Sequence, residues 1–157
     1  MAILTCPITR VIRETPRNRI VRVALGNRLL AFEAGQYALL GDHGQPIRKP
    51  YSIACAPAQV KLDHELEFLI QVVDGESPGS HLATLGEGRL VDLEGPSGSF
   101  VLPGGANPRA VALNGGGPGR APQGAVPWAM LAGSPGTRGG AVHGRHTPKE
   151  PGTYPGV

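Results

Sequence analysis

Residues that bind phosphate and residues that contact flat rings occur together in one short segment of the chain. The segment Arg48-Lys49-Pro50-Tyr51-Ser52-Ile53-Ala54 contains two cations, a phenol and a hydroxyl, followed by apolar side chains. Cations and hydroxyl donors bind phosphate, whereas a flat heteroaromatic ring needs an aromatic or apolar face with a hydroxyl at its polar edge. The segment therefore predicts a site for a planar, anionic ligand such as a flavin nucleotide. The alternative is a β-strand with a solvated basic end.

A second segment with phosphate-binding potential follows the next predicted apolar strand. Ser77 is a suitable N-cap, Pro78 fits the first helical position and Gly86 fits a C-terminal stop, so a short helix is predicted here. The backbone N–H groups around Gly79 and Ser80 would have no partner within that helix and would lie at the positive end of its dipole, so they suit a pyrophosphate. The alternative is a capped surface helix without a ligand.

In these two segments and in their order, the chain resembles the flavin-binding domain of the ferredoxin-NADP reductase superfamily, whose signature is Arg-x-Tyr-Ser on a barrel strand. The matching residues are Lys49-Pro50-Tyr51-Ser52. Lys49 stands where the family has arginine, and a lysine keeps the charge but loses the bidentate fork. Arg48 comes one position earlier, so on a strand it points to the opposite face.

The resemblance implies a role for each matching residue. Lys49 would neutralise the flavin phosphate, Tyr51 would lie against the isoalloxazine ring, and Ser52 would hydrogen-bond near its reactive N5 edge. Tyr51 and Ser52 are thus the expected residues nearest the chemistry. The cofactor-binding set implied by the resemblance is Lys49, Pro50, Tyr51, Ser52, Gln71, Val72, Val73, Gly79 and Ser80.

The resemblance also implies the chemistry and the partners. Members of the family exchange a hydride between a nicotinamide and the flavin, and then pass single electrons to an iron-sulfur protein or another acceptor. FAD is the expected cofactor, although FMN is compatible with the same residues. The choice between NADH and NADPH and the identity of the acceptor are left open.

The elements that position these segments are mostly short strands. Alternating and branched side chains separated by turn residues predict many strands and one short helix, which is typical of an antiparallel barrel. The resembling family has a six-stranded Greek-key barrel with one capping helix, and the likeness extends over roughly residues 1–113. The expected fold is therefore an all-β, six-stranded antiparallel Greek-key barrel. Its predicted strands are 8–13, 19–25, 28–32, 37–40, 50–55, 66–73, 89–94 and 99–102.

The last part of the chain differs from the rest in composition. Glycine and proline, 24 and 16 residues in total, are concentrated from Asn114 to Val157, so this tail is expected to be irregular and to build no core. In the family a nicotinamide-binding domain begins here, but Pro118, Pro122 and Pro127 exclude the required helix. A reading-frame shift just past Gly117 is one hypothesis, to be checked by resequencing the gene, and a natural disordered tail is the other.

Three functions remain open on this basis. The first is the flavin-binding domain of an NAD(P)H-dependent oxidoreductase, with the nicotinamide-binding half missing or supplied by another polypeptide. The second is a flavin-binding or partner-docking barrel without catalysis, and the third is an inactive fragment. Whether the chain alone is an enzyme is left open.

Charge and cysteine content narrow the class of protein. The formal net charge of +3 arises in the tail, because residues 1–113 carry equal numbers of acidic and basic residues. With no basic excess in the folded part, a nucleic-acid partner is not expected.

Cys6 and Cys55 have no metal-binding spacing and are expected to be small core residues. The sequence shows no leader pattern and no apolar stretch long enough to cross a bilayer, so a cytoplasmic protein without a membrane partner is expected.

Overall fold

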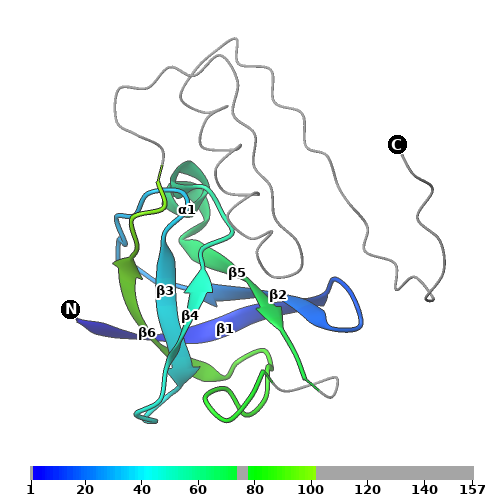
Figure 1. Ribbon diagram of the computed structural model, residues 1–157. Coiled ribbons are helices and arrows are strands. Elements are labelled where there is room, and N and C mark those ends of the chain that lie inside the picture. Colours follow the sequence, from blue (N-terminus) through cyan, green and yellow to red (C-terminus); the bar gives the residue numbers. More distant parts are fainter. Residues whose placement is uncertain (1, 74–77, 102–157) are drawn as a thin grey trace, which may run out of the picture.

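Six β-strands and one short helix make up the part of the chain that the computed structural model describes, residues 2–73 and 78–101 (Figure 1). This arrangement confirms the all-β class predicted from the sequence. In chain order the elements are β1 (Ile3–Arg13), β2 (Asn18–Ala24), β3 (Tyr37–Asp42), β4 (Lys49–Ser52), α1 (Pro57–Asp63), β5 (Glu65–Gln71) and β6 (Leu90–Ser97).

All six strands form one antiparallel sheet with the order β4-β3-β6-β1-β2-β5. The last strand, β6, lies between β3 and β1. The first and last strands of the described chain therefore pair with each other at the centre of the sheet. The edge strands β4 and β5 approach each other (Figure 1), and one bridge between Ile53 and Phe68 connects them. The Ala54 N–H donates to the Glu67 carbonyl over 2.7 Å at the same place. The predicted six-stranded architecture is therefore correct, but the sheet is not fully closed into a barrel.

The core lies on the inner face of this sheet and follows from alternation along its strands. Val21 and Val23 of β2 are buried, and Val21 is paired with buried Phe68 of β5. Because successive residues of a strand point to opposite faces, Arg22 and Glu67 lie on the outer face. Their side chains form an ion pair of 3.0 Å. The pattern of apolar and charged residues thus fixes which face of β2 and β5 is buried.

The predicted position of the helix is wrong. Among the described residues, 78–86 contain no helix, because Gly79 has φ +124°, outside the helical region, and forms a β-bridge with Leu82. The helix of this fold is α1, where the sequence predicted only a break between two strands. Pro57 lies in its first turn, and His64 ends it in the left-handed conformation with φ 55°. A proline fits the start of a helix and a tight turn equally well, so local signals did not separate the two segments.

Two predicted strands are not strands in the structure. Residues 28–32 follow the turn at residues 26–27 and have no regular secondary structure; the Arg28 N–H donates to the Leu25 carbonyl over 3.3 Å and its guanidinium donates to the Thr5 carbonyl over 2.8 Å. Residues 99–101 also form no strand, and the last residue of that predicted strand lies outside the described residues. Both segments have a strand-like composition without a neighbouring strand to pair with, and pairing decides whether a strand forms.

The first strand is longer than predicted and places Cys6 in the core. β1 begins at Ile3 because its first residues pair with β6, Ile3 opposite Glu94. Cys6 and Cys55 are buried and free, as predicted for core residues. Burial raises the pKa of both thiols, that of Cys55 to about 11, so both are protonated and unreactive at neutral pH.

Several sequence predictions concern residues that the structure does not describe. Ser77, the predicted N-cap, and the tail from 114 to 157 lie outside the described ranges. Within residues 2–73 and 78–101, no helix combines the length and the apolar character needed to span a bilayer.

Candidate functional site

The two segments singled out by the sequence meet in space. Tyr51 of β4 and His81 of the segment between β5 and β6 are 30 positions apart, yet the Tyr51 hydroxyl lies 2.6 Å from His81 Nε2. The ring centroids are 5.7 Å apart and the ring planes differ by 20°. The rings are nearly parallel, but centroids 5.7 Å apart together with the hydroxyl contact show that they are offset, so His81 meets the hydroxyl end of Tyr51 and does not lie over its face. The face of the phenol ring is not covered by this imidazole.

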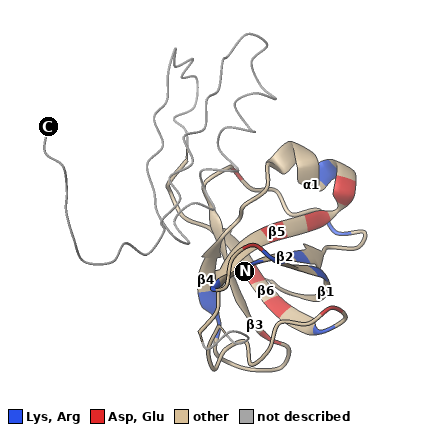
Figure 2. Cartoon of the chain, turned by 90° about the vertical axis from the view of Figure 1, so that its right-hand side faces the viewer, with Lys and Arg blue, Asp and Glu red and all other residues tan. Residues whose placement is uncertain are grey.

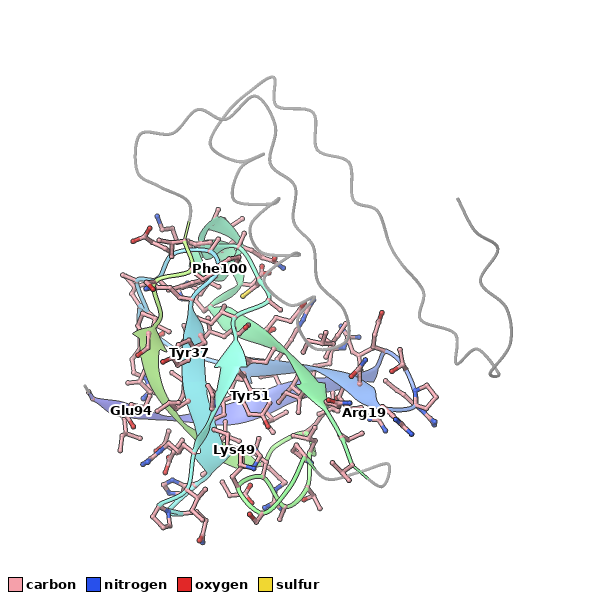
Figure 3. The ribbon with its side chains drawn as sticks, viewed as in Figure 1. Arg19, Tyr37, Lys49, Tyr51, Glu94 and Phe100 are labelled. Carbon is pink, nitrogen blue, oxygen red and sulfur yellow. The ribbon has the colours of Figure 1, made fainter. Side chains whose placement is uncertain are left out.

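Lys49 approaches the same segment two residues earlier in β4. Residues i and i+2 of a strand share a face, and Lys49 and Tyr51 both project from β4 (Figure 3). A Cβ atom on Gly79 would lie 4.0 Å from Lys49 Nζ and 3.5 Å from His81 Nδ1. The ammonium group and the imidazole therefore border one small space, which stays open because residue 79 has no side chain.

The electrostatics of this cluster leave a single positive charge on it. Burial raises the pKa of Tyr51 to about 12, so the phenol stays neutral. Burial, and next the neighbouring Lys49 cation, lower the pKa of His81, whereas Asp42 acts in the opposite direction. A neutral phenol and a neutral imidazole thus lie beside a lysine ammonium. Figure 2 shows this positive charge on β4, across from acidic residues on β5.

Asp42, at the end of β3, holds the segment that carries His81. The Asp42 N–H donates to the His81 carbonyl over 2.7 Å, and Asp42 Oδ2 accepts from the Ala83 N–H over 2.9 Å. The guanidinium of Arg89 lies 3.6 Å from Asp42 Oδ1. The segment 78–86 is therefore fixed against the sheet by backbone and carboxylate contacts, without a helix of its own.

His81 and Asp42 are functional candidates that sequence reasoning missed. The sequence pattern around His81 pointed to its glycine, serine and proline residues, and neither His81 nor Asp42 is among the site residues predicted from the sequence. A histidine directly before an apolar residue, Leu82, in a polar segment was the available signal. This signal indicates a functional residue only once the structure shows that His81 is 1% exposed.

Arg48 and Lys49 have different surroundings, as their neighbouring positions in the strand predict. Arg48 Nη1 lies 4.0 Å from Glu94 Oε2 of β6, and its side chain is largely buried. Lys49 is exposed and lies beside Gly79. Figure 3 shows Glu94 well away from Lys49. The cation of the site is therefore Lys49, and Arg48 belongs to the contacts between β3, β4 and β6.

Ser52 ends β4 opposite Tyr37 of β3. It is half-buried, and the next residue, Ile53, donates its N–H to the Gln36 carbonyl over 3.0 Å. The ring of Tyr37 covers Gly98, where a Cβ atom would lie 3.0 Å from the Tyr37 ring. The segment after β6 is thus tied to the same end of β4 on which Ser52 lies.

The remaining predicted site residues have varied surroundings. Pro50 is exposed and lies opposite Leu39, and Ser80 is exposed next to His81. Gln71 is exposed opposite Asn18 of β2. Val72 is buried, with its N–H donating to the Arg17 carbonyl over 2.8 Å, and Val73 is 60% exposed. The hydrogen bonds of Gln71 and Val72 thus run toward β2, and the role of the 71–73 segment in the site stays a prediction.

The arrangement fits a ligand with a phosphate group and a flat ring. Lys49 supplies a cation, and Gly79 leaves room for a close approach to the backbone. His81 Nδ1 is buried and has no hydrogen-bond partner among the described residues, although a buried polar atom is normally paired. The partly exposed ring of Tyr51 and the hydroxyl of Ser52 provide the face and the polar edge that a heteroaromatic ring needs.

The solved structures that resemble this chain include several reductases. No family model and no curated protein sequence matches the chain. Among solved structures, the cytochrome P450 reductase GcoB from Amycolatopsis is 32% identical with a TM-score of 0.72, over 83% of this chain and 39% of that one. Phthalate dioxygenase reductase, 19% identical, has a TM-score of 0.64 over 84% and 40%. The ferredoxin NADP+ reductase from Neisseria gonorrhoeae with bound FAD and NADP, 21% identical, has a TM-score of 0.52 over 64% and 40%.

The chain spans 39% to 40% of the length of these three proteins. Its strand order, its β4 motif and the structural likeness to the 32% identical reductase agree with one another. The described residues therefore have the fold of the flavin-binding domain of the ferredoxin-NADP reductase superfamily.

Proposed function

We propose that this chain binds FAD between β4 and the segment 78–86, and that it serves as the flavin-binding domain of an NAD(P)H-dependent oxidoreductase. The observation that carries this proposal is the convergence of Tyr51 and Lys49 of β4 on His81 and Gly79. A structure in the same superfamily contains bound FAD and NADP. FMN is the less favoured alternative.

Each residue of the site has a physical role in this proposal. Lys49 attracts the phosphate group, and the backbone at Gly79 and Ser80 gives the phosphate a close approach that a side chain would block. Tyr51 supports the flavin ring, Ser52 hydrogen-bonds to its polar edge, and Pro50 keeps this part of the edge strand free of a backbone donor. Gln71 at the end of β5 and the following residues Val72 and Val73 complete the site. The flavin itself supplies the hydride and single-electron chemistry when bound.

The wider activity passes electrons between a nicotinamide and an iron-sulfur protein or a similar acceptor. Phthalate dioxygenase reductase, which shares this fold, is a modular structure for electron transfer from pyridine nucleotides to a [2Fe-2S] centre. We propose an iron-sulfur protein or similar acceptor as one redox partner and a separate nicotinamide-binding polypeptide as another. The proposed location is the cytoplasm.

We propose a domain boundary between residues 113 and 114. Residues 1–113 form the flavin-binding domain, and 114–157 form a Gly- and Pro-rich tail in the place of the nicotinamide-binding domain. Limited proteolysis followed by mass measurement tests this division. A resistant fragment that ends near residue 113 supports it, and a resistant fragment that includes the tail contradicts it.

The deciding experiment is to purify the chain and identify any small molecule that it releases on denaturation. We expect the absorbance bands of a bound flavin and the mass of FAD. Released FMN would correct the cofactor, and a folded chain that binds neither flavin would contradict the proposal. Adding NADH or NADPH then separates a reductase from a flavin-binding module: in the module the flavin binds but is not reduced. An aggregated chain without cofactor would favour the inactive fragment.

A further inference from the structure

His81 makes a contact for which the proposed cofactor roles give no account. Its side chain comes from the segment 78–86, is 1% exposed and ends against the hydroxyl of Tyr51. Tyr51 is only partly buried and packs against the edge of the core. A partly exposed phenol on an edge strand has freedom to rotate, and a hydrogen bond to a fully buried ring removes that freedom.

We propose that His81 is a positioning residue for Tyr51, holding the phenol ring in the orientation in which its free face lies against the flavin. This inference rests on the proposed flavin site and deepens it. The contact at the hydroxyl end leaves the ring face open, which a face-to-face stack would not do. The contact between Tyr51 and His81 also connects the proposed ring-binding part of the site on β4 to the proposed phosphate-binding part at Gly79.

The hydrogen bond exists in either tautomer of the imidazole. A phenol can donate or accept, and a neutral imidazole has one donor and one acceptor nitrogen. Nε2 therefore pairs with the Tyr51 oxygen whichever nitrogen carries the proton. The other nitrogen, Nδ1, is buried without a partner among the described residues and borders the space beside Gly79 and Lys49.

The groups around His81 favour its neutral form. Tyr51 faces its Nε2, the Lys49 cation lies on the side of Nδ1, and the Asp42 carboxylate, itself near Arg89, lies along its backbone. Burial and the Lys49 charge lower the pKa of His81, and Asp42 offsets part of that effect. Protonation in acid would place a buried cation at His81 beside the exposed ammonium of Lys49. The arrangement is therefore most stable above roughly pH 6.5, the ordinary value for histidine, and weakens as the pH falls below it.

A double-mutant cycle tests the proposal on the full chain. His81→Phe, Tyr51→Phe and the double variant are compared for FAD affinity by flavin fluorescence and for the flavin absorbance and circular dichroism spectra. We expect each single variant to weaken FAD binding roughly five- to tenfold, the range for one lost hydrogen bond, and the double variant to be no weaker than either single one. Both single variants should alter the flavin spectrum in the same way.

Control variants make clear which result would contradict the proposed role of His81. His81→Gln keeps a polar side chain and is used if His81→Phe does not fold. His64→Asn changes an exposed histidine that ends α1 and should leave FAD affinity and spectrum unchanged. Additive losses in the cycle, or an unchanged spectrum in the folded His81 variants, would overturn the role of His81 while the flavin site stands. If the unmodified, folded chain binds no flavin, the proposed function fails first, and the role of His81 fails with it.

Discussion

Lys49 Nζ lies 4.0 Å from the position that a Cβ atom would take on Gly79, although the two residues are 30 positions apart. The lysine ends a basic run on an edge strand, and the glycine has φ +124°, a conformation that other residues rarely adopt. This single relationship places a cation beside an open stretch of backbone. It is the feature from which the predictions about phosphate binding follow.

Reversing the charge at Lys49 should weaken FAD binding more than any neutral change there. In Lys49→Glu a carboxylate replaces the ammonium beside the phosphate space, and we expect a loss of affinity of roughly a hundredfold, about 2.7 kcal/mol, measured by flavin fluorescence at about 0.1 M salt. Lys49→Arg keeps the charge and should bind nearly as well as the unmodified chain.

Lys61→Glu provides the control for this reversal, because Lys61 is exposed on α1. It changes the net charge equally and should leave FAD affinity within about twofold, since an exposed charge further away than about 10 Å is screened by salt. Equal losses in the Lys49 and Lys61 variants would show that only the overall charge matters.

Removing the ring of Tyr51 should cost more FAD affinity than removing its hydroxyl. Tyr51→Ala deletes the aromatic face and the hydrogen bond to His81 together, and we expect at least a thirtyfold loss, about 2 kcal/mol. Equilibrium dialysis with FAD measures it. Tyr154→Ala removes a tyrosine from the proposed tail and should have no effect; retention of flavin by Tyr51→Ala would remove this residue from the site.

Substitutions at two glycines with positive φ distinguish the effect of backbone strain from the loss of the proposed FAD site. Gly79 has φ +124° with His81 and Lys49 beside it, whereas Gly88 has φ +83° with nothing within 4 Å of its Cβ position. Gly79→Ala and Gly88→Ala should each destabilise the fold by about 1–2 kcal/mol in urea unfolding, because both strain the backbone. Only Gly79→Ala should also lower FAD affinity. A similar loss of affinity in Gly88→Ala would indicate a general effect of unfolding.

Acid stability should depend on Asp92. Burial acts to raise the pKa of this carboxyl, but hydrogen bonds from the Gly44 N–H, His43 and Thr5 lower it to about 2. Since the pKa in the unfolded chain is about 3.9, the stabilisation is complete above that pH and is lost as the pH falls toward 2.

Urea unfolding between about pH 5 and pH 2 measures this slope of stability against pH. Asp92→Asn should flatten the slope and lower stability at neutral pH, because it removes the negative charge that His43 and Thr5 contact. Asp63→Asn, a change at an exposed residue of α1, should leave the slope as it is. An unchanged slope in Asp92→Asn would mean that other carboxyl groups dominate acid unfolding.

The motif on β4 and the class of the fold were predictable because they depend on local patterns. Alternation placed Val21 and Phe68 in the core and Arg22 outside, and a cation, a phenol and a hydroxyl in four residues indicated a ligand with a phosphate and a ring. The position of the helix was not predictable in the same way, because Pro57 and Pro78 offer the same local signal. What separated them was pairing within the sheet and the positive φ of Gly79.

The sequence by itself determined the all-β class, the residue types of the β4 motif and the division of charge between Arg48 and Lys49. Only the tertiary structure decided that His81 meets Tyr51, that Gly79 opens beside Lys49 and that Asp42 holds the intervening segment. The physical reason is range: alternation and turn preference act over a few residues, whereas these contacts join residues 30 or more positions apart. They form because the antiparallel sheet brings the end of β3, the edge strand β4 and the segment before β6 to the same place.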